Sequence, residues 1–278
     1  MHPGEMGSAV GACLRGAGHH VVWVSGGRSS ASRDRAERAG LDEGSTLEEV
    51  LSSVRSVISI CPPHGAVDLA SEVTSAGFAG TYVDANAVSP STSRLIRTMV
   101  EGGGGSYVDG GIIGPPPMLP GTTRLYVCGD EAAETAELFS GSCLDAHAID
   151  APVGAASALK MAYAAWTKGS IALLSAVLAV AQREDVGAHL RDEWVISQPG
   201  WQRRIDQAAS SAPKAWRWVA EMEEIADTFA DAGMPEGFHR SAAEMFQRLA
   251  GFKGAEEVSI EELLKVLTDE TRASGGVL

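Results

Sequence analysis

A long apolar segment in the middle of the chain separates two regions with different sequence patterns. The segment runs from Val153 to Gln182, and at about 1.5 Å per residue it would form a helix of about 45 Å. Short apolar runs alternate with helical stretches before it, and this alternation stops near residue 150. The sequence therefore predicts an α/β domain over residues 1–150 and an all-α domain over residues 151–278, which begins with the long interdomain helix 153–182.

The first region has the pattern of a doubly wound parallel sheet. Its candidate strands are short apolar runs separated by helical stretches. They are HVVWV, SVISI, TYVDA, SYVDGGII and RLYVCG, which begin at residues 20, 56, 81, 106 and 124. Strands that alternate with helices form parallel sheets, and such sheets bind ligands at the carboxyl ends of their strands.

The motif HPGEMG near the start is the back half of a glycine fingerprint for phosphate binding. Gly4 would let a pyrophosphate approach the N–H groups of a helix N-terminus, and Gly7 would let that helix pack closely on a sheet. Glu5 and Met6 lie between the two glycines. His2 replaces the first glycine of the fingerprint, and no strand precedes the motif. We therefore expect that the first strand of the sheet is missing and that the natural start lies upstream; an ordinary glycine-rich turn is the alternative.

The residues after HVVWV favour NADPH over NADH as the cofactor. An acidic residue at this point would hold the ribose 2′-hydroxyl of NADH, but this chain has Ser25, two glycines, Arg28 and Ser29. A guanidinium group beside small hydroxyls suits a 2′-phosphate. The alternative is a solvated loop with a surface arginine.

Three loops at predicted strand ends could line the site. Cys61, Pro62 and Pro63 follow the strand at 56–60, and Asn86 follows the strand at 81–85. Asn86 could bind the ribose or carboxamide of the cofactor, or cap a turn. Ile113 and Gly114 precede three prolines. Their backbone N–H groups could bind a carboxylate or carbonyl oxygen, or the segment could form a rigid turn.

Lys160 is the candidate for catalysis. On a helix it shares one face with Ala164 and Thr167. A desolvated lysine has a lowered pKa and can serve as a general acid or base; a surface charge is the alternative. Trp218, Glu221, Thr228 and His239 could close a substrate pocket across a dimer interface, or form a solvated acidic face with a hydrogen-bonded histidine.

Charge and composition exclude several classes of partner. The formal net charge of -14 disfavours nucleic acid and anionic membranes. The four cysteines show no CxxC spacing, and no His, Cys and carboxylate set has the spacing of a metal site. The longest uncharged apolar run, Ile171 to Ala181, is too short to span a bilayer. We expect a cytoplasmic protein that binds no metal.

Taken together, the motifs resemble the β-hydroxyacid dehydrogenase superfamily, which includes 3-hydroxyisobutyrate and 6-phosphogluconate dehydrogenases. The resemblance rests on HPGEMG, DANAVSP, DGGIIGPPP, GTTRLYVCG and LKMAYAAWTKG, and it is closest to a poorly characterised branch whose C-terminal domain has no known function. It implies a Rossmann domain, a long interdomain helix, an all-α C-terminal domain and a homodimer formed through the helical domain. It also implies that Lys160 is the catalytic lysine. The implied cofactor contacts are Gly4, Met6, Gly7, Arg28, Pro62 and Asn86.

The chain departs from the better-known members of that superfamily at the substrate site. Ala164 stands where they have an asparagine, and Ile113 and Gly114 stand in place of a serine-glycine-glycine loop. We therefore expect a less acidic or bulkier small substrate, contacted by Trp166, Thr167 and Trp218. The prediction is an NADP(H)-dependent oxidoreductase that interconverts a hydroxyl and a carbonyl. The alternatives are an imine reductase on the same scaffold and a dimeric NADP-binding protein without turnover.

Overall fold

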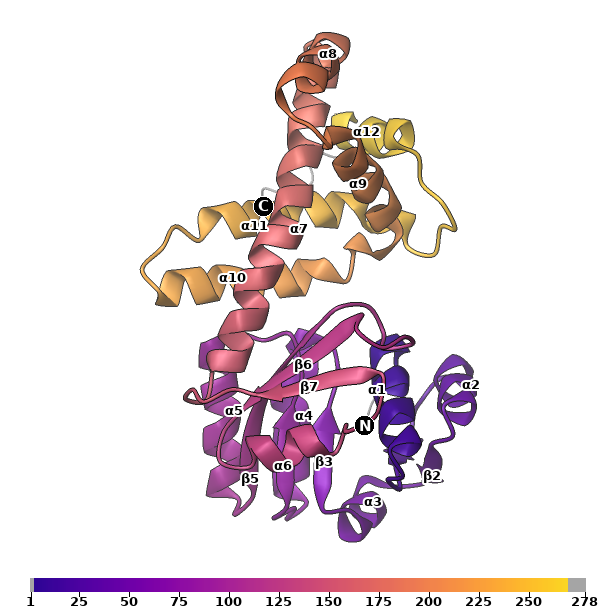
Figure 1. Ribbon diagram of the computed structural model, residues 1–278, viewed down its shortest axis with the longest axis vertical. Helices are drawn as coiled ribbons and strands as arrows, with labels where there is room; N and C mark the ends of the chain where they lie inside the picture. Colours follow the sequence, from indigo (N-terminus) through magenta and orange to yellow (C-terminus); the bar gives the residue numbers. More distant parts are fainter. Residues whose placement is uncertain (1–2, 270–278) are drawn as a thin grey trace. The chain divides into compact units, whose positions relative to one another are not determined.

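The computed structural model describes residues 3–269, which form two compact units (Figure 1). The first unit ends at Ala162 and the second begins at Tyr163. The boundary lies inside the long helix α7 (Ala155–Arg183), close to the predicted helix 153–182. The first unit thus extends past the predicted domain boundary at residue 150, because it includes the first turns of α7.

Within residues 3–162 the first unit contains seven strands in two sheets. They are β1 (Val22–Val24), β2 (Asp42–Gly44), β3 (Ser56–Ser59), β4 (Thr81–Asp84), β5 (Ser106–Ile113), β6 (Thr123–Cys128) and β7 (Leu144–Ala148). The larger sheet has the order β3-β4-β5-β6-β7, and β1 and β2 form a separate pair. All neighbours are parallel except β5 and β6, so the expectation of a wholly parallel sheet is wrong at this pair. The loop between these two strands contains no crossover helix, and a parallel pair requires one.

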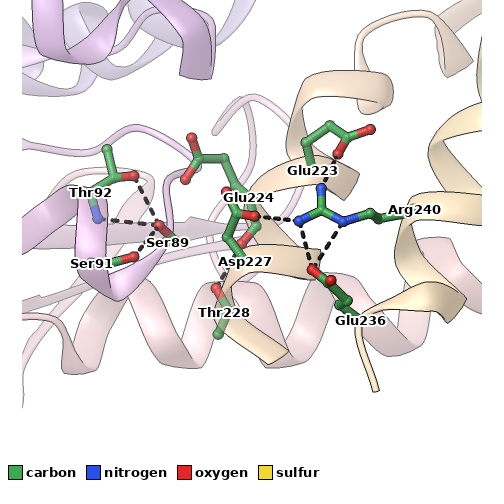
Figure 2. A network of polar contacts seen from close by, with 9 residues as sticks. All are labelled: Ser89, Ser91, Thr92, Glu223, Glu224, Asp227, Thr228, Glu236 and Arg240. Carbon is green, nitrogen blue, oxygen red and sulfur yellow. Dashed lines mark hydrogen bonds and ion pairs between the residues drawn. The ribbon is translucent and has the colours of Figure 1, made fainter. Parts of the chain in front are cut away.

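Helices cover both faces of the larger sheet. Helices α1 (Glu5–Gly16) and α6 (Ala132–Glu137) pack on one face, and α4 (Ala66–Ser75) and α5 (Pro90–Gly102) pack on the other. Helix α2 (Ser30–Arg38) packs against α1, and α3 (Leu47–Ser53) packs against β1 and β2. Because successive strand residues point to opposite faces, Val83 and Val108 pack with α1 while Tyr82 and Tyr107 belong to the core formed with α4 and α5. Several helix starts are capped by hydroxyls; Ser89, for example, caps α5 and contacts Ser91 and Thr92 (Figure 2).

Within residues 3–269 the two sheets have four edge strands, which are β1 and β2 in the pair and β3 and β7 in the larger sheet. Among residues 3–269, β1 pairs only with β2, and β3 pairs only with β4. All of these strands are parallel to their partners. The expected strand before the glycine turn stays a prediction, and His2 lies outside the described residues.

The second unit is all-helical, as predicted. After α7 come α8 (Gly187–Ser197), α9 (Trp201–Ala215), α10 (Trp218–Asp231), α11 (Gly237–Arg248) and α12 (Ile260–Thr268). Met222 and Ile225 of α10 are fully buried, as is Phe246 of α11. A capping box formed by Ser259 and Glu262 opens α12. On the surface, Arg240 forms ion pairs with Glu223, Asp227 and Glu236 (Figure 2).

Helix α7 is more apolar than its longest uncharged run suggested. Within residues 3–269 it is the one helix whose length and composition would allow it to cross a membrane, although 44% of its most apolar window is buried inside the protein. Core helices of globular proteins meet the same criteria, so this finding is weak evidence for a membrane span.

Candidate active site

Lys160 lies in the second turn of α7, directly above strand β5. The approach is close because residue 111 is a glycine: a Cβ atom there would lie 2.6 Å from the Ala156 carbonyl oxygen and 3.0 Å from the Lys160 Cβ. Gly111 also lies two residues beyond Asp109, which forms the last residue pair between β4 and β5. The lysine is therefore held past the carboxyl end of β4, where ligands bind in sheets of this type.

Asp109 connects β5 to the start of α7. This residue is fully buried, and its Oδ2 atom accepts hydrogen bonds from the backbone N–H groups of Gly154 (2.9 Å) and Ser157 (3.1 Å). Its Oδ1 atom accepts from the hydroxyls of Ser157 (2.5 Å) and Ser93 (3.0 Å). The Cys128 thiol donates to the same carboxylate at 3.3 Å. This network joins residues that lie far apart in the sequence, so no local pattern indicates it.

Asn86 connects the loops that follow β3 and β4. Its Oδ1 atom accepts from the backbone N–H of Cys61 at 2.6 Å, and its Nδ2 donates to the Ser59 hydroxyl at 2.8 Å. Its backbone N–H donates to Asp84 at 3.0 Å. Burial raises the pKa of Asp84 to about 7, and the neighbouring Asp109 adds to this effect. Through these hydrogen bonds Asn86 holds the two predicted cofactor loops together.

The glycine turn leaves the N-terminus of α1 accessible. Gly4 is the N-cap of α1, no side chain caps the helix, and a Cβ atom on Gly4 would meet no atom within 4 Å. The first N–H groups of a helix lack intrahelical acceptors. Glu5, Met6 and Gly7 supply these groups here. Arg35 fixes the turn by donating from Nε to the Pro3 carbonyl at 2.9 Å.

Arg28 has a side-chain donor that no described protein group satisfies. Its Nε atom is buried and has no hydrogen-bond partner within residues 3–269. Burial raises the pKa of the Cys61 thiol to about 11, and the charge of Arg28 slightly opposes this rise. Buried polar groups usually have partners. Together with the accessible helix end at Gly4, this orphan donor fits a dinucleotide that carries an additional phosphate.

The serines beside Arg28 have local roles. The buried Ser25 hydroxyl donates to the Gly44 carbonyl at 3.3 Å, and Ser29 caps α2 by accepting from the Ser32 N–H. Arg33 pairs with Glu43, with Nη1 2.5 Å from Oε1. The guanidinium of Arg28 is therefore the better candidate for phosphate binding in this loop.

The predicted substrate residues are divided between the two units. Ile113, at the end of β5, and Gly114, which has a φ of +130°, belong to the first unit. Ala164, Thr167 and Trp218 belong to the second unit. Ala164 is fully buried, and the Thr167 hydroxyl donates to the Tyr163 carbonyl one turn earlier. The Trp218 ring packs edge-on against Phe246.

The second unit contains a buried ion pair that involves Glu221, for which a solvated acidic face was one of two interpretations from the sequence. Lys168 pairs with Glu221, and their side chains are only 18% and 7% exposed. The Lys168 ammonium also lies 5.2 Å from the centre of the Trp218 ring. The interpretation as a solvated acidic face is therefore wrong at Glu221, because α7 supplies a cation that allows the carboxylate to be buried.

His239 also differs from expectation. It is buried against Phe229 and faces Gly169, and burial lowers its pKa. Its Nδ1 atom has no hydrogen-bond partner in the part of the chain that the structure describes. The interpretation of His239 as a hydrogen-bonded histidine is therefore wrong for this nitrogen.

Comparison with known proteins agrees with this architecture. A family model described as a domain of unknown function (DUF1932) matches residues 181–249. An uncharacterized 28.5 kDa protein from Methanothermus fervidus is 28% identical over 157 residues, which span 56% of this chain and 60% of that relative. The match thus covers less than two thirds of the relative's length.

Solved structures match nearly the whole chain. One is a conserved protein of unknown function that is described as structurally similar to 3-hydroxyacid dehydrogenases. It is 30% identical, with a TM-score of 0.67 and coverage of 90% of this chain and 95% of that one. The 3-hydroxyisobutyrate dehydrogenase of Mycobacterium tuberculosis, solved with L-serine, shares the fold at 19% identity, with a TM-score of 0.65 and coverage of 96% and 97%.

The chain belongs to the β-hydroxyacid dehydrogenase superfamily, in a branch whose C-terminal domain has no known function.

Proposed function

We propose that the protein is an NADPH-dependent oxidoreductase that interconverts a hydroxyl and a carbonyl group on a small substrate in the cytoplasm. The observation that carries the proposal is the position of Lys160 against Gly111, past the carboxyl end of β4. The same unit holds the accessible helix end at Gly4 and the orphan donor of Arg28. Membership of a dehydrogenase superfamily supports this assignment.

Each residue has a distinct task in this proposal. Arg28 binds the 2′-phosphate, and the first N–H groups of α1 bind the pyrophosphate. Asn86 holds the loops that orient the nicotinamide, whose chemistry when bound is to supply or accept a hydride. The Lys160 ammonium donates a proton from Nζ to the carbonyl oxygen during reduction, and the neutral amine accepts that proton during oxidation.

The cofactor assignment predicts a selective effect at Arg28. The Arg28→Ala variant should bind NADPH about 10- to 100-fold more weakly and NADH almost unchanged, because only NADPH has the phosphate that the guanidinium contacts. Fluorescence titration of both cofactors measures this. Arg33→Ala is the control, since Arg33 pairs with Glu43 and its loss should leave NADPH affinity within about two-fold. Equal affinity of the unmodified protein for NADH and NADPH would contradict the assignment.

The reaction class is tested with a panel of hydroxy acids, aldehydes and imines, monitored by nicotinamide absorbance. Turnover of a hydroxyl or carbonyl substrate supports the proposal. Turnover of imines alone would instead identify an imine reductase. NADPH binding with no turnover across the panel would leave a cofactor-binding protein.

We also propose a homodimer formed through an exposed apolar face of α7. Tyr163, Trp166, Leu173, Val177 and Val180 recur at intervals of three, four or seven residues, and between 37% and 69% of each is exposed. This spacing is typical of helix-pairing seams. We expect Leu173→Glu to convert the dimer to a monomer in light scattering, and Val195→Glu, at an exposed position on α8 outside this face, to leave it unchanged. A monomeric unmodified protein would refute the proposal.

A further inference from the structure

We propose that Asp109 is the positioning residue of Lys160, and that it acts by capping the N-terminus of α7 from inside the sheet. The inference rests on the proposed function for the role of Lys160, but the capping contacts are independent of it. The cap does not come from a residue next to the helix in sequence. The Asp109 carboxylate on β5, 45 residues before Gly154, accepts hydrogen bonds from the backbone N–H groups of Gly154 and Ser157.

The contacts of Asp109 fix the first turn of α7 both in its position along β5 and in its rotation about the helix axis. Two backbone N–H groups and the Ser157 hydroxyl converge on its two carboxylate oxygens. A negative charge is stabilised at this end of a helix, and charged hydrogen bonds are stronger than neutral ones. The helix start therefore has little freedom to rotate or slide on β5.

Lys160 follows Ser157 by three residues, so it lies one turn above the capped end. Gly111 gives the second constraint, because α7 passes there at backbone contact distance. Asp109 and Gly111 are alternate residues on the same face of β5. They hold two successive turns of α7, and the direction in which the Lys160 side chain leaves the helix follows from both. Misplacement of a reacting group by about 1 Å can reduce a rate by about 100-fold.

An amide cannot replace this carboxylate. Every described contact of Asp109 is with a donor, on both oxygens. Asparagine would direct an NH2 group at one set of these donors and would remove the charge at the helix end. Asp84 offers a matched contrast, because it is equally buried, has a pKa of about 7, and bonds to Asn86 and Tyr107 rather than to α7.

The test compares Asp109→Asn with Asp84→Asn. In Asp109→Asn we expect kcat to fall about 10- to 100-fold, with KM and the Kd for NADPH within about three-fold. Hydrogen exchange should accelerate in residues 155–162, and the rate at which an amine-reactive reagent labels Lys160 should change while that of Lys265 does not. Asp84→Asn should leave the hydrogen exchange of residues 155–162 and the labelling rate of Lys160 close to those of the unmodified protein. Unchanged exchange and labelling in Asp109→Asn would overturn the proposal.

A double-variant cycle separates positioning from a general structural effect. If Asp109 acts through Lys160, adding Asp109→Asn to Lys160→Gln should cost no further kcat. An equal fall in both backgrounds would overturn the proposal. Should Asp109→Asn fail to fold, Ser157→Ala removes one bond to the carboxylate and should lower kcat by about three- to ten-fold, again only when Lys160 is present.

The proposed function can fail separately from this inference. Full activity in Lys160→Gln, or no turnover by the unmodified protein, would remove the catalytic role of the lysine. Hydrogen exchange and labelling would still decide whether Asp109 holds the first turn of α7.

Discussion

Lys160→Gln should reduce kcat by about 1000-fold while the Kd for NADPH stays within about two-fold. The size of the loss reflects removal of a general acid, which contributes roughly 100- to 10,000-fold to enzyme rates. Glutamine keeps much of the length and polarity of the side chain but cannot deliver a proton at neutral pH. The rate would be measured by nicotinamide absorbance on the best substrate from the panel, and the affinity by fluorescence titration.

Lys265→Gln is the matched control for this experiment, because that lysine is exposed on α12 in the helical unit. It should leave kcat and cofactor affinity unchanged. Retention of most alcohol oxidation by Lys160→Gln would show that the proton moves through another group. A parallel loss of NADPH affinity would show instead that the lysine contributes to cofactor binding.

Glu221→Gln should lower the free energy of unfolding of the helical unit by about 3 kcal/mol. The substitution leaves the buried ammonium of Lys168 without the carboxylate that now pairs with it, and breaking a buried ion pair from one side costs several kcal/mol. Calorimetry or urea denaturation would measure the change. Replacing both partners, in Lys168→Met/Glu221→Gln, should recover most of the loss because no buried charge remains.

Glu223→Gln on the same helix gives the surface comparison. Its ion pair with Arg240 is more than 40% exposed on both sides, and such pairs contribute at most about 1 kcal/mol. Equal destabilisation by Glu221→Gln and Glu223→Gln would mean that burial does not govern the strength of the Lys168–Glu221 pair.

The sequence predicted those elements whose hydrophobic pattern is local. The run SYVDGGII coincides with β5, and the predicted helix 153–182 nearly coincides with α7. Strand β2 could not be predicted, because Asp42, Glu43 and Gly44 give no apolar signal. Helix α8 has no buried residues and hence no amphipathic pattern. The antiparallel pairing of β5 and β6 depends on a loop path that periodicity does not encode.

The sequence indicates candidate site residues where one residue type implies a chemistry, as for Gly4, Arg28 and Lys160, whose roles stay predictions. A role that depends on a distant partner was not predictable. Asp109 meets Gly154 across 45 residues, and Lys168 meets Glu221 across 53. Asp109 stands in a strand before two glycines, and nothing in that local pattern indicates that its carboxylate caps a distant helix.

The close passage of α7 over Gly111 affects how sequence differences among relatives at this position should be interpreted. A residue with no side chain and no chemistry would tolerate substitution as poorly as the reacting lysine, because any larger group at position 111 must push the helix away from the strand. Invariance at such a position across relatives would therefore record a spacing requirement and should not be taken as a mark of direct participation in the reaction.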